Sequence, residues 1–175
     1  MMKRCLTAVV AVFAVVFVLT GSVLAADNFG ARLRGNEEVP PISTTGQGFF
    51  FATLNGAETQ LDYSIVYFGL TGAVTQSHIH IGQPGVNGGI VLFLCTNLAP
   101  PAGVPVPPPC PSGTGPVPVT VSGTLTAANV ITQNAQGIAA GEFSEVIDAM
   151  RAIVSYANIH SDLFPGGEVR GVVTH

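Results

Sequence analysis

Two histidines separated by one residue, His78 and His80, are the part of this sequence best suited to chemistry. They lie in the run Val74–Ile81, where polar and apolar residues alternate as they do in a β-strand. Side chains of a strand point alternately to its two faces, so both imidazoles share one face with Gln76, while Ile79 points the other way. Neutral imidazole is a good ligand for copper and zinc, so the pair provides half of a metal site.

A third histidine, His160, lies in a second alternating run at residues 155–161, where it shares the polar face with Asn158. Three imidazoles and one open position form a reasonable site for copper first and zinc second. His175 is a weaker candidate for a fourth ligand because chain ends are usually mobile. The predicted metal site depends on His78, His80 and His160 meeting on one exposed polar face.

A second explanation needs no metal. Each histidine could hydrogen-bond across strands to Gln76, Asn158 or Glu168, and Glu168 could form an ordinary ion pair with Arg170. If a metal is bound, Asp162 and Glu168 are candidate acceptors that support its imidazoles. The sequence has neither nucleophile-elbow spacing nor a glycine-rich phosphate loop, so we predict no catalytic residues.

The elements that must position these residues are short strands. Alternating runs separated by glycine, proline and asparagine recur along the chain, which predicts an all-β fold: an antiparallel Greek-key sandwich or barrel of about eight strands. A type I′ turn is expected at Asn55-Gly56. The expected strands are residues 28–35, 46–54, 60–68, 74–81, 89–95, 117–125, 155–161 and 168–174.

One segment has helical periodicity. Across residues 141–153 the apolar positions recur every three or four residues, from Phe143 to Ile153, with charged residues opposite. This pattern predicts a single short amphipathic helix that packs over one end of the sandwich. A helical turn after Thr126 is also expected, because a threonine can cap it.

The first 26 residues have the three parts of a secretory signal. Lys3 and Arg4 precede an apolar stretch, and small residues follow it up to Ala26. The stretch is short for a membrane span of about 20 residues, although an uncleaved anchor is the alternative. We therefore expect a secreted or periplasmic protein with one domain at residues 27–175 and no other membrane attachment.

The charge of that domain limits its partners. Four arginines stand against ten acidic residues once residues 1–26 are removed, so the formal charge is −6. This acidic balance argues against nucleic acid as a partner. The remaining candidates are an extracellular protein, which the sequence does not identify, or a metal ion.

Two cysteines remain in the domain, Cys95 and Cys110. In an exported chain they are expected to form a disulfide, and a two-thiolate metal site is the alternative. The segment between them holds six of the thirteen prolines. We therefore interpret residues 99–118 as a long surface excursion tethered by the disulfide.

Several blocks of the sequence together resemble the CHRD domain, a module repeated in chordin and found singly in exported bacterial proteins. They extend from about residue 28 to residue 174 and include LRGNEEVPP at 33–41, SHIHIG at 77–82, YANIH at 156–160 and PGGEVRG at 165–171. The resemblance implies an extracellular β-rich domain, which in animals is associated with binding growth-factor-like proteins. The Glu38-containing block could be a binding edge, although its two prolines also suit the protection of a strand edge.

A more distant similarity is to copper/zinc superoxide dismutase. That family also has a Greek-key β-structure, with a His-x-His strand and a later strand histidine as copper ligands and an arginine in a closing glycine-rich strand. By this resemblance His78, His80 and His160 match copper ligands, and Arg170 stands near the anion-guiding arginine. The departure is the lack of any histidine between Ile81 and Ile159, which removes the bridging ligand and the zinc set.

Together these observations predict an exported, non-enzymatic binding module with a histidine metal site. A copper-handling protein is the first alternative, and a dismutase-like enzyme is the second.

Overall fold

A computed structural model describes residues 26–175, so the predicted signal segment lies outside the described residues except for Ala26. Within these residues, eight strands and one α-helix make up the fold. The strands are β1 (Asn28–Arg34), β2 (Gln47–Leu54), β3 (Leu61–Phe68), β4 (Val74–Ile81), β5 (Gly89–Thr96), β6 (Val119–Leu125), β7 (Ser155–Ser161) and β8 (Val169–Val172).

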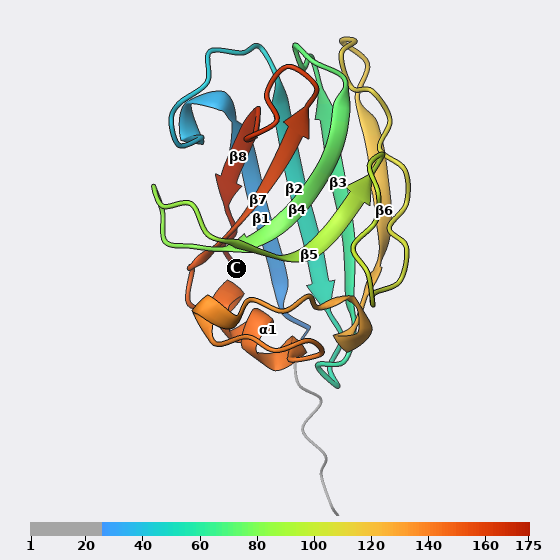
Figure 1. Ribbon diagram of the computed structural model, residues 1–175, viewed down its shortest axis with the longest axis vertical. Coiled ribbons are helices and arrows are strands. Elements are labelled where there is room, and N and C mark those ends of the chain that lie inside the picture. Colours follow the sequence, from blue (N-terminus) through green and yellow to red (C-terminus); the bar gives the residue numbers. More distant parts are fainter. Residues whose placement is uncertain (1–25) are drawn as a thin grey trace, which may run out of the picture.

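All eight strands pair antiparallel in the order β5-β4-β7-β8-β1-β2-β3-β6. The sheet curls so that β5, β4, β7 and β8 lie over β1, β2, β3 and β6, and the edge strands β5 and β6 approach each other (Figure 1). The hydroxyl of Tyr63 on β3 donates to the carbonyl of Leu94 on β5 and ties the two layers together. The result is the predicted all-β sandwich or nearly closed barrel.

The alternating pattern is the reason that the strand predictions are confirmed. On β2, Phe50, Ala52 and Leu54 are buried in the core while Phe51 points outward, and β3 repeats the pattern at Leu61, Tyr63 and Ile65. Each strand therefore contributes every second side chain to one apolar interior.

The turn between β2 and β3 differs from the prediction. The loop has six residues instead of two, and Asn55 Oδ1 accepts hydrogen bonds from the amides of Thr59 (2.9 Å) and Gln60 (3.1 Å). The positive φ belongs to Glu58 at 54°, whereas a type I′ turn would require positive φ at both Asn55 and Gly56. Side-chain acceptance by Asn55 has stabilised a longer loop.

The helix α1 (Phe143–Arg151) lies where the periodicity predicted it and covers one end of the barrel (Figure 1). Phe143, Val146 and Met150 are buried against the core. Ile153, which was expected to continue the apolar stripe, lies beyond the helix with φ 59° and is 40% exposed. Within residues 26–175, no helix has the length and apolar character needed to cross a bilayer.

Three 3-10 helices complete the elements: η1 (Gly35–Glu37), η2 (Ala127–Asn129) and η3 (Asn134–Gln136). η2 confirms the turn expected after Thr126, and the Asn129 side-chain oxygen closes it by accepting from the amide (2.9 Å) and the hydroxyl (3.2 Å) of Thr126.

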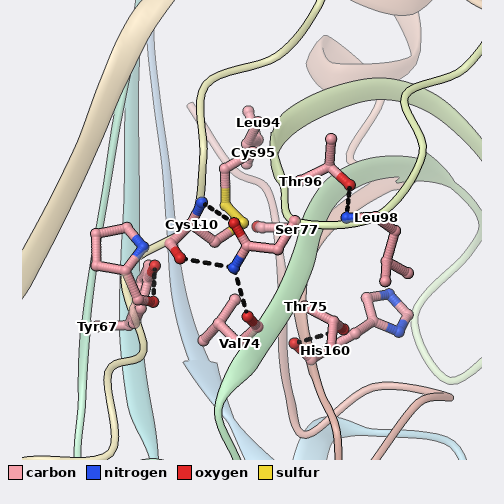
Figure 2. Close-up of a disulfide and its surroundings, with 12 residues drawn as sticks. Tyr67, Val74, Thr75, Ser77, Leu94, Cys95, Thr96, Leu98, Cys110 and His160 are labelled. Atoms are coloured by element: carbon pink, nitrogen blue, oxygen red, sulfur yellow. Dashed lines mark hydrogen bonds between the residues drawn. A yellow bond between two sulfur atoms is a disulfide. The ribbon is translucent and has the colours of Figure 1, made fainter.

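The predicted disulfide joins Cys95 at the end of β5 to Cys110 in the proline-rich excursion (Figure 2). Asn97 reinforces the join, because its amide group donates to the carbonyls of Val74 (2.9 Å) and Cys110 (2.7 Å) and accepts from the Cys110 amide (3.0 Å). The disulfide and Asn97 therefore hold the excursion against β4, one of the two strands that bear the histidines.

Removing the disulfide should destabilise the domain. The chain-entropy model assigns about 3 kcal/mol to closing a loop of about 15 residues, so the Cys95→Ala/Cys110→Ala variant should lose about that free energy of unfolding. Urea unfolding of both proteins measures the difference. A loss below about 1 kcal/mol would show that Asn97 alone holds the excursion.

Candidate metal centre

Strand pairing brings the predicted site residues together. On adjacent strands, His78 of β4 is paired with Asn158 of β7, and Asn158 with Arg170 of β8. Because Ile79 and Ile159 point into the core, these polar side chains lie on the opposite, outer face of the sheet. His160 shares this face, since it is two residues from Asn158.

The outer face is covered here, which corrects the expectation of an exposed polar surface. His78, His80 and His160 are only 0%, 6% and 7% exposed. Arg170 donates to the carbonyl of Val86 (2.6 Å) and thereby holds the loop after β4 over the sheet. The site is a second, polar interior between the sheet and its loops.

The three imidazoles converge. Their ring centroids are 5.4 Å apart for His78 and His80, 4.9 Å for His78 and His160, and 6.2 Å for His80 and His160. One nitrogen from each ring can be chosen so that all three lie within 4.8 Å of one another. The prediction that the three histidines meet is therefore correct in geometry.

His160 has one nitrogen ready for a ligand. Its Nδ1 lies 2.9 Å from the carbonyl oxygen of Pro165, which can only accept, so Nδ1 carries the proton. Nε2 is then a lone-pair donor, and it is buried without a hydrogen-bond partner. The backbone at His160 is held as well, because the Thr75 hydroxyl donates to the His160 carbonyl at 3.3 Å (Figure 2).

His80 is oriented in the same way by a second backbone carbonyl. Its Nδ1 donates to Gly88 O at 3.0 Å, so Nε2, 3.0 Å from the Asn158 side chain, must accept in the neutral ring. The Asn158 atom at this distance is its side-chain oxygen, so the amide group has to be turned to present its NH₂ to a neutral His80. Binding a metal through this Nε2 would require Asn158 to release it.

His78 lies at the centre of the group and has no hydrogen bonds. Both ring nitrogens are buried without a partner, and the ring packs edge-on against Phe93 with centroids 4.3 Å apart. A buried polar atom without a partner costs about 1–3 kcal/mol. Of the three histidines, His78 therefore has the least favourable burial free energy, because neither of its ring nitrogens is hydrogen-bonded.

All three imidazoles are held neutral, which is the form that binds metal. Burial lowers the pKa of His78 to about 2, with smaller contributions from His160 and His80. Burial also lowers the pKa of His80 to about 4, although its hydrogen bond with Gly88 acts in the opposite sense. The pKa of His160 is lowered mainly by burial, against the effect of its bond with Pro165.

Tyr156 and Arg170 form a stack of planar side chains on the His80 ring. The His80 ring is stacked on Tyr156 with centroids 4.6 Å apart and planes 5° from parallel, and the Arg170 guanidinium carbon lies 3.4 Å from the Tyr156 ring centroid. A cation over an aromatic face is attractive, and more so when desolvated. The buried charge of Arg170 thus fixes Tyr156, and Tyr156 fixes His80.

Other predicted residues lie elsewhere. His175 packs beside Phe29 and is outside the histidine cluster. Glu168 does not pair with Arg170 or an imidazole; it accepts hydrogen bonds from the Thr44 hydroxyl (2.6 Å) and the Thr71 amide (2.6 Å). Asp162 accepts from the Ala73 amide (2.9 Å), so both carboxylates hold turns.

A sequence profile of the CHRD domain matches residues 29–173. The chain belongs to the CHRD domain family. Comparison with curated proteins and with solved structures found no match. The histidine centre lies wholly within the matched region of this CHRD domain.

The contacts that sequence reasoning missed in this CHRD domain are those made by the backbone. The carbonyls of Gly88 and Pro165 orient His80 and His160. Every residue has a backbone carbonyl, so this role cannot be predicted from residue type. Tyr156 could have been found, because alternation places it on the same face as Asn158 and His160.

The buried histidines should make the metal-free domain less stable in mild acid. Below about pH 6.5 the histidines of the unfolded chain take up protons, whereas folded His78 and His80, with pKa values of about 2 and 4, do not. Glu38 has the opposite effect on stability between pH 4.5 and 7, because its pKa rises from 4.5 to about 7 on folding and the folded state takes up the proton first. This single group offsets only part of the effect of the three histidines. The free energy of unfolding should therefore fall as the pH drops from 6.5 to 5.

Urea unfolding in the presence of chelator, at several pH values, measures this dependence. The His78→Leu variant should show a slope smaller by up to about 1.4 kcal/mol per pH unit. Equal slopes for the variant and the parent would contradict a neutral His78 in the folded state.

Proposed function

We propose that this CHRD domain is an exported, non-enzymatic binding protein that holds one copper ion through His78, His80 and His160. The observation that carries the proposal is a set of buried ring nitrogens without partners, both on His78 and Nε2 on His160, inside a three-histidine cluster. Buried polar atoms in proteins are nearly always satisfied, so an unpaired set at one point calls for a ligand.

A metal ion would satisfy the lone-pair nitrogen of His78 and Nε2 of His160 together, which no single hydrogen-bond acceptor or carbonyl could do. Neutral imidazole coordinates through its lone pair, and a ligating histidine usually donates its other N–H to a carbonyl or carboxylate. His80 and His160 already do so, to Gly88 and Pro165. These two contacts place the N–H of each ring on Nδ1 and leave Nε2 as the lone-pair nitrogen; Nε2 of His160 has no partner, whereas Nε2 of His80 would first have to be released by the Asn158 side chain.

Copper is the better candidate on ligand type. All three donors are imidazole nitrogens, and the affinity of such a set for divalent ions peaks at copper. Zinc is second.

The surroundings favour a protein that binds a copper ion over an enzyme that converts a substrate. Arg170, the residue that the dismutase resemblance places near the metal, is 1% exposed. Its guanidinium donates to Asn87 and Val86 and lies on Tyr156, so its role is to fix the loop and the stack. The Cys95–Cys110 disulfide and the signal-like first 26 residues support an extracytoplasmic location.

Metal content of the purified protein tests the proposal. The protein is loaded with copper(II) or zinc(II), desalted and analysed by mass spectrometry of the elements. We expect about one copper per chain, and paramagnetic resonance should show coupling to nitrogen ligands. The His78→Ala and His160→Ala variants should lose at least about tenfold in copper affinity, since each removes a ligand.

His175→Ala is the matched control, because it removes a histidine outside the cluster and should leave copper binding unchanged. Copper content near zero in the parent, or equal affinity in the parent and the His78→Ala and His160→Ala variants, would refute the metal site. A chelator-insensitive protein partner found in a pull-down would then favour a purely protein-binding role.

A further inference from the structure

A small apolar pocket lies beside the metal centre, between two of the motifs that the sequence shares with the CHRD family. One wall comes from the segment that follows η1 and the other from the loop between β7 and β8. The pocket has a volume of about 200 Å³. It is lined by Glu38, Val39, Pro40 and Ile42 on one side and by residues 163–167 on the other.

Glu38 is the one charged residue in that lining. It is only 5% exposed, and its Oε1 is buried without a hydrogen-bond partner. The nearby Arg170 does not supply one, since its guanidinium donates to Asn87 and Val86 and makes no ion pair with Glu38 within 4.0 Å. A buried carboxyl oxygen in apolar surroundings is costly unless a donor reaches it.

The backbone is shaped to keep the carboxyl group there. Gly167 has a φ of 128°, which side-chain-bearing residues rarely adopt, and a Cβ at this position would lie 2.5 Å from Glu38 Oε1. Gly167, in the PGGEVRG block, therefore leaves room for Glu38, in the LRGNEEVPP block. Two distant parts of the chain together build a carboxyl group into an apolar cavity.

We propose that this pocket binds a small primary alkylammonium group. The charge of the ammonium complements Glu38 in a protein whose formal charge is already negative, and its N–H groups can satisfy the orphaned Oε1. The apolar walls suit a short alkyl chain. At about 30 Å³ per water, the pocket equals roughly seven waters, enough for an ammonium with a short branched chain and too little for a larger ligand.

Binding of isobutylammonium chloride to the metal-free, chelator-treated protein at pH 7.5 tests the proposal separately from the copper site. Amide chemical shifts in an NMR titration should move saturably for residues 38–42 and 163–167. The Glu38→Gln variant should bind about 10- to 100-fold more weakly, because the charge-assisted hydrogen bond is lost. Glu37→Gln, which changes the exposed neighbouring glutamate, should bind like the parent.

A second variant covers the case in which Glu38→Gln fails to fold. Leu163 is 60% exposed at the rim, so Leu163→Ala should fold and weaken binding by about three- to tenfold through lost apolar contact. Isobutanol, which has the same body without the charge, should bind far more weakly than the amine. N-acetyl-lysine methylamide tests whether a lysine side chain also enters; binding of both amines, or of the free amine alone, supports the proposal.

Three results would overturn it. These are the absence of saturable shifts in the parent, equal affinity of the parent and the folded Glu38→Gln variant, and equal affinity for isobutanol and isobutylammonium. None of them bears on copper binding, which is measured on a different set of residues.

Discussion

The burial of three imidazoles on the outer face of the sheet is the constraint on which the rest of the site depends. A histidine beneath a loop loses its hydration, so each ring nitrogen must find a partner or remain unsatisfied. The carbonyls of Gly88 and Pro165 satisfy one nitrogen each on His80 and His160. His78, between them, is left with none, and burial keeps the three rings neutral.

Arg170 links the histidine cluster to its surroundings. From β8 it covers Tyr156, which stacks on His80, and it also holds the loop around Val86 over the sheet. Its charge lies in the same region as the Glu38 carboxyl and lowers that group's pKa, though burial raises it more. One buried cation thus orders both the stack and the covering loop.

Much of the fold follows from local pattern, and the failures have identifiable physical reasons. Alternation located the strands because each strand contributes every second residue to one core, as Phe50 and Ile65 show. The Asn55 loop was wrongly expected to be a two-residue turn because a side-chain acceptor stabilised a longer one. Ile153 fits the helical period, yet the helix ends before it and turns it toward solvent.

The sequence by itself determined which residues could act and which face of each strand they occupy, since side-chain direction in a strand depends only on position along the chain. It therefore predicted that His78, His80 and His160 are the candidate ligands. Only the tertiary structure decided that β4 and β7 are neighbours, that loops bury the three rings, and that Glu38 meets Gly167. These outcomes depend on contacts between segments remote in sequence and on backbone carbonyls, which residue types do not reveal.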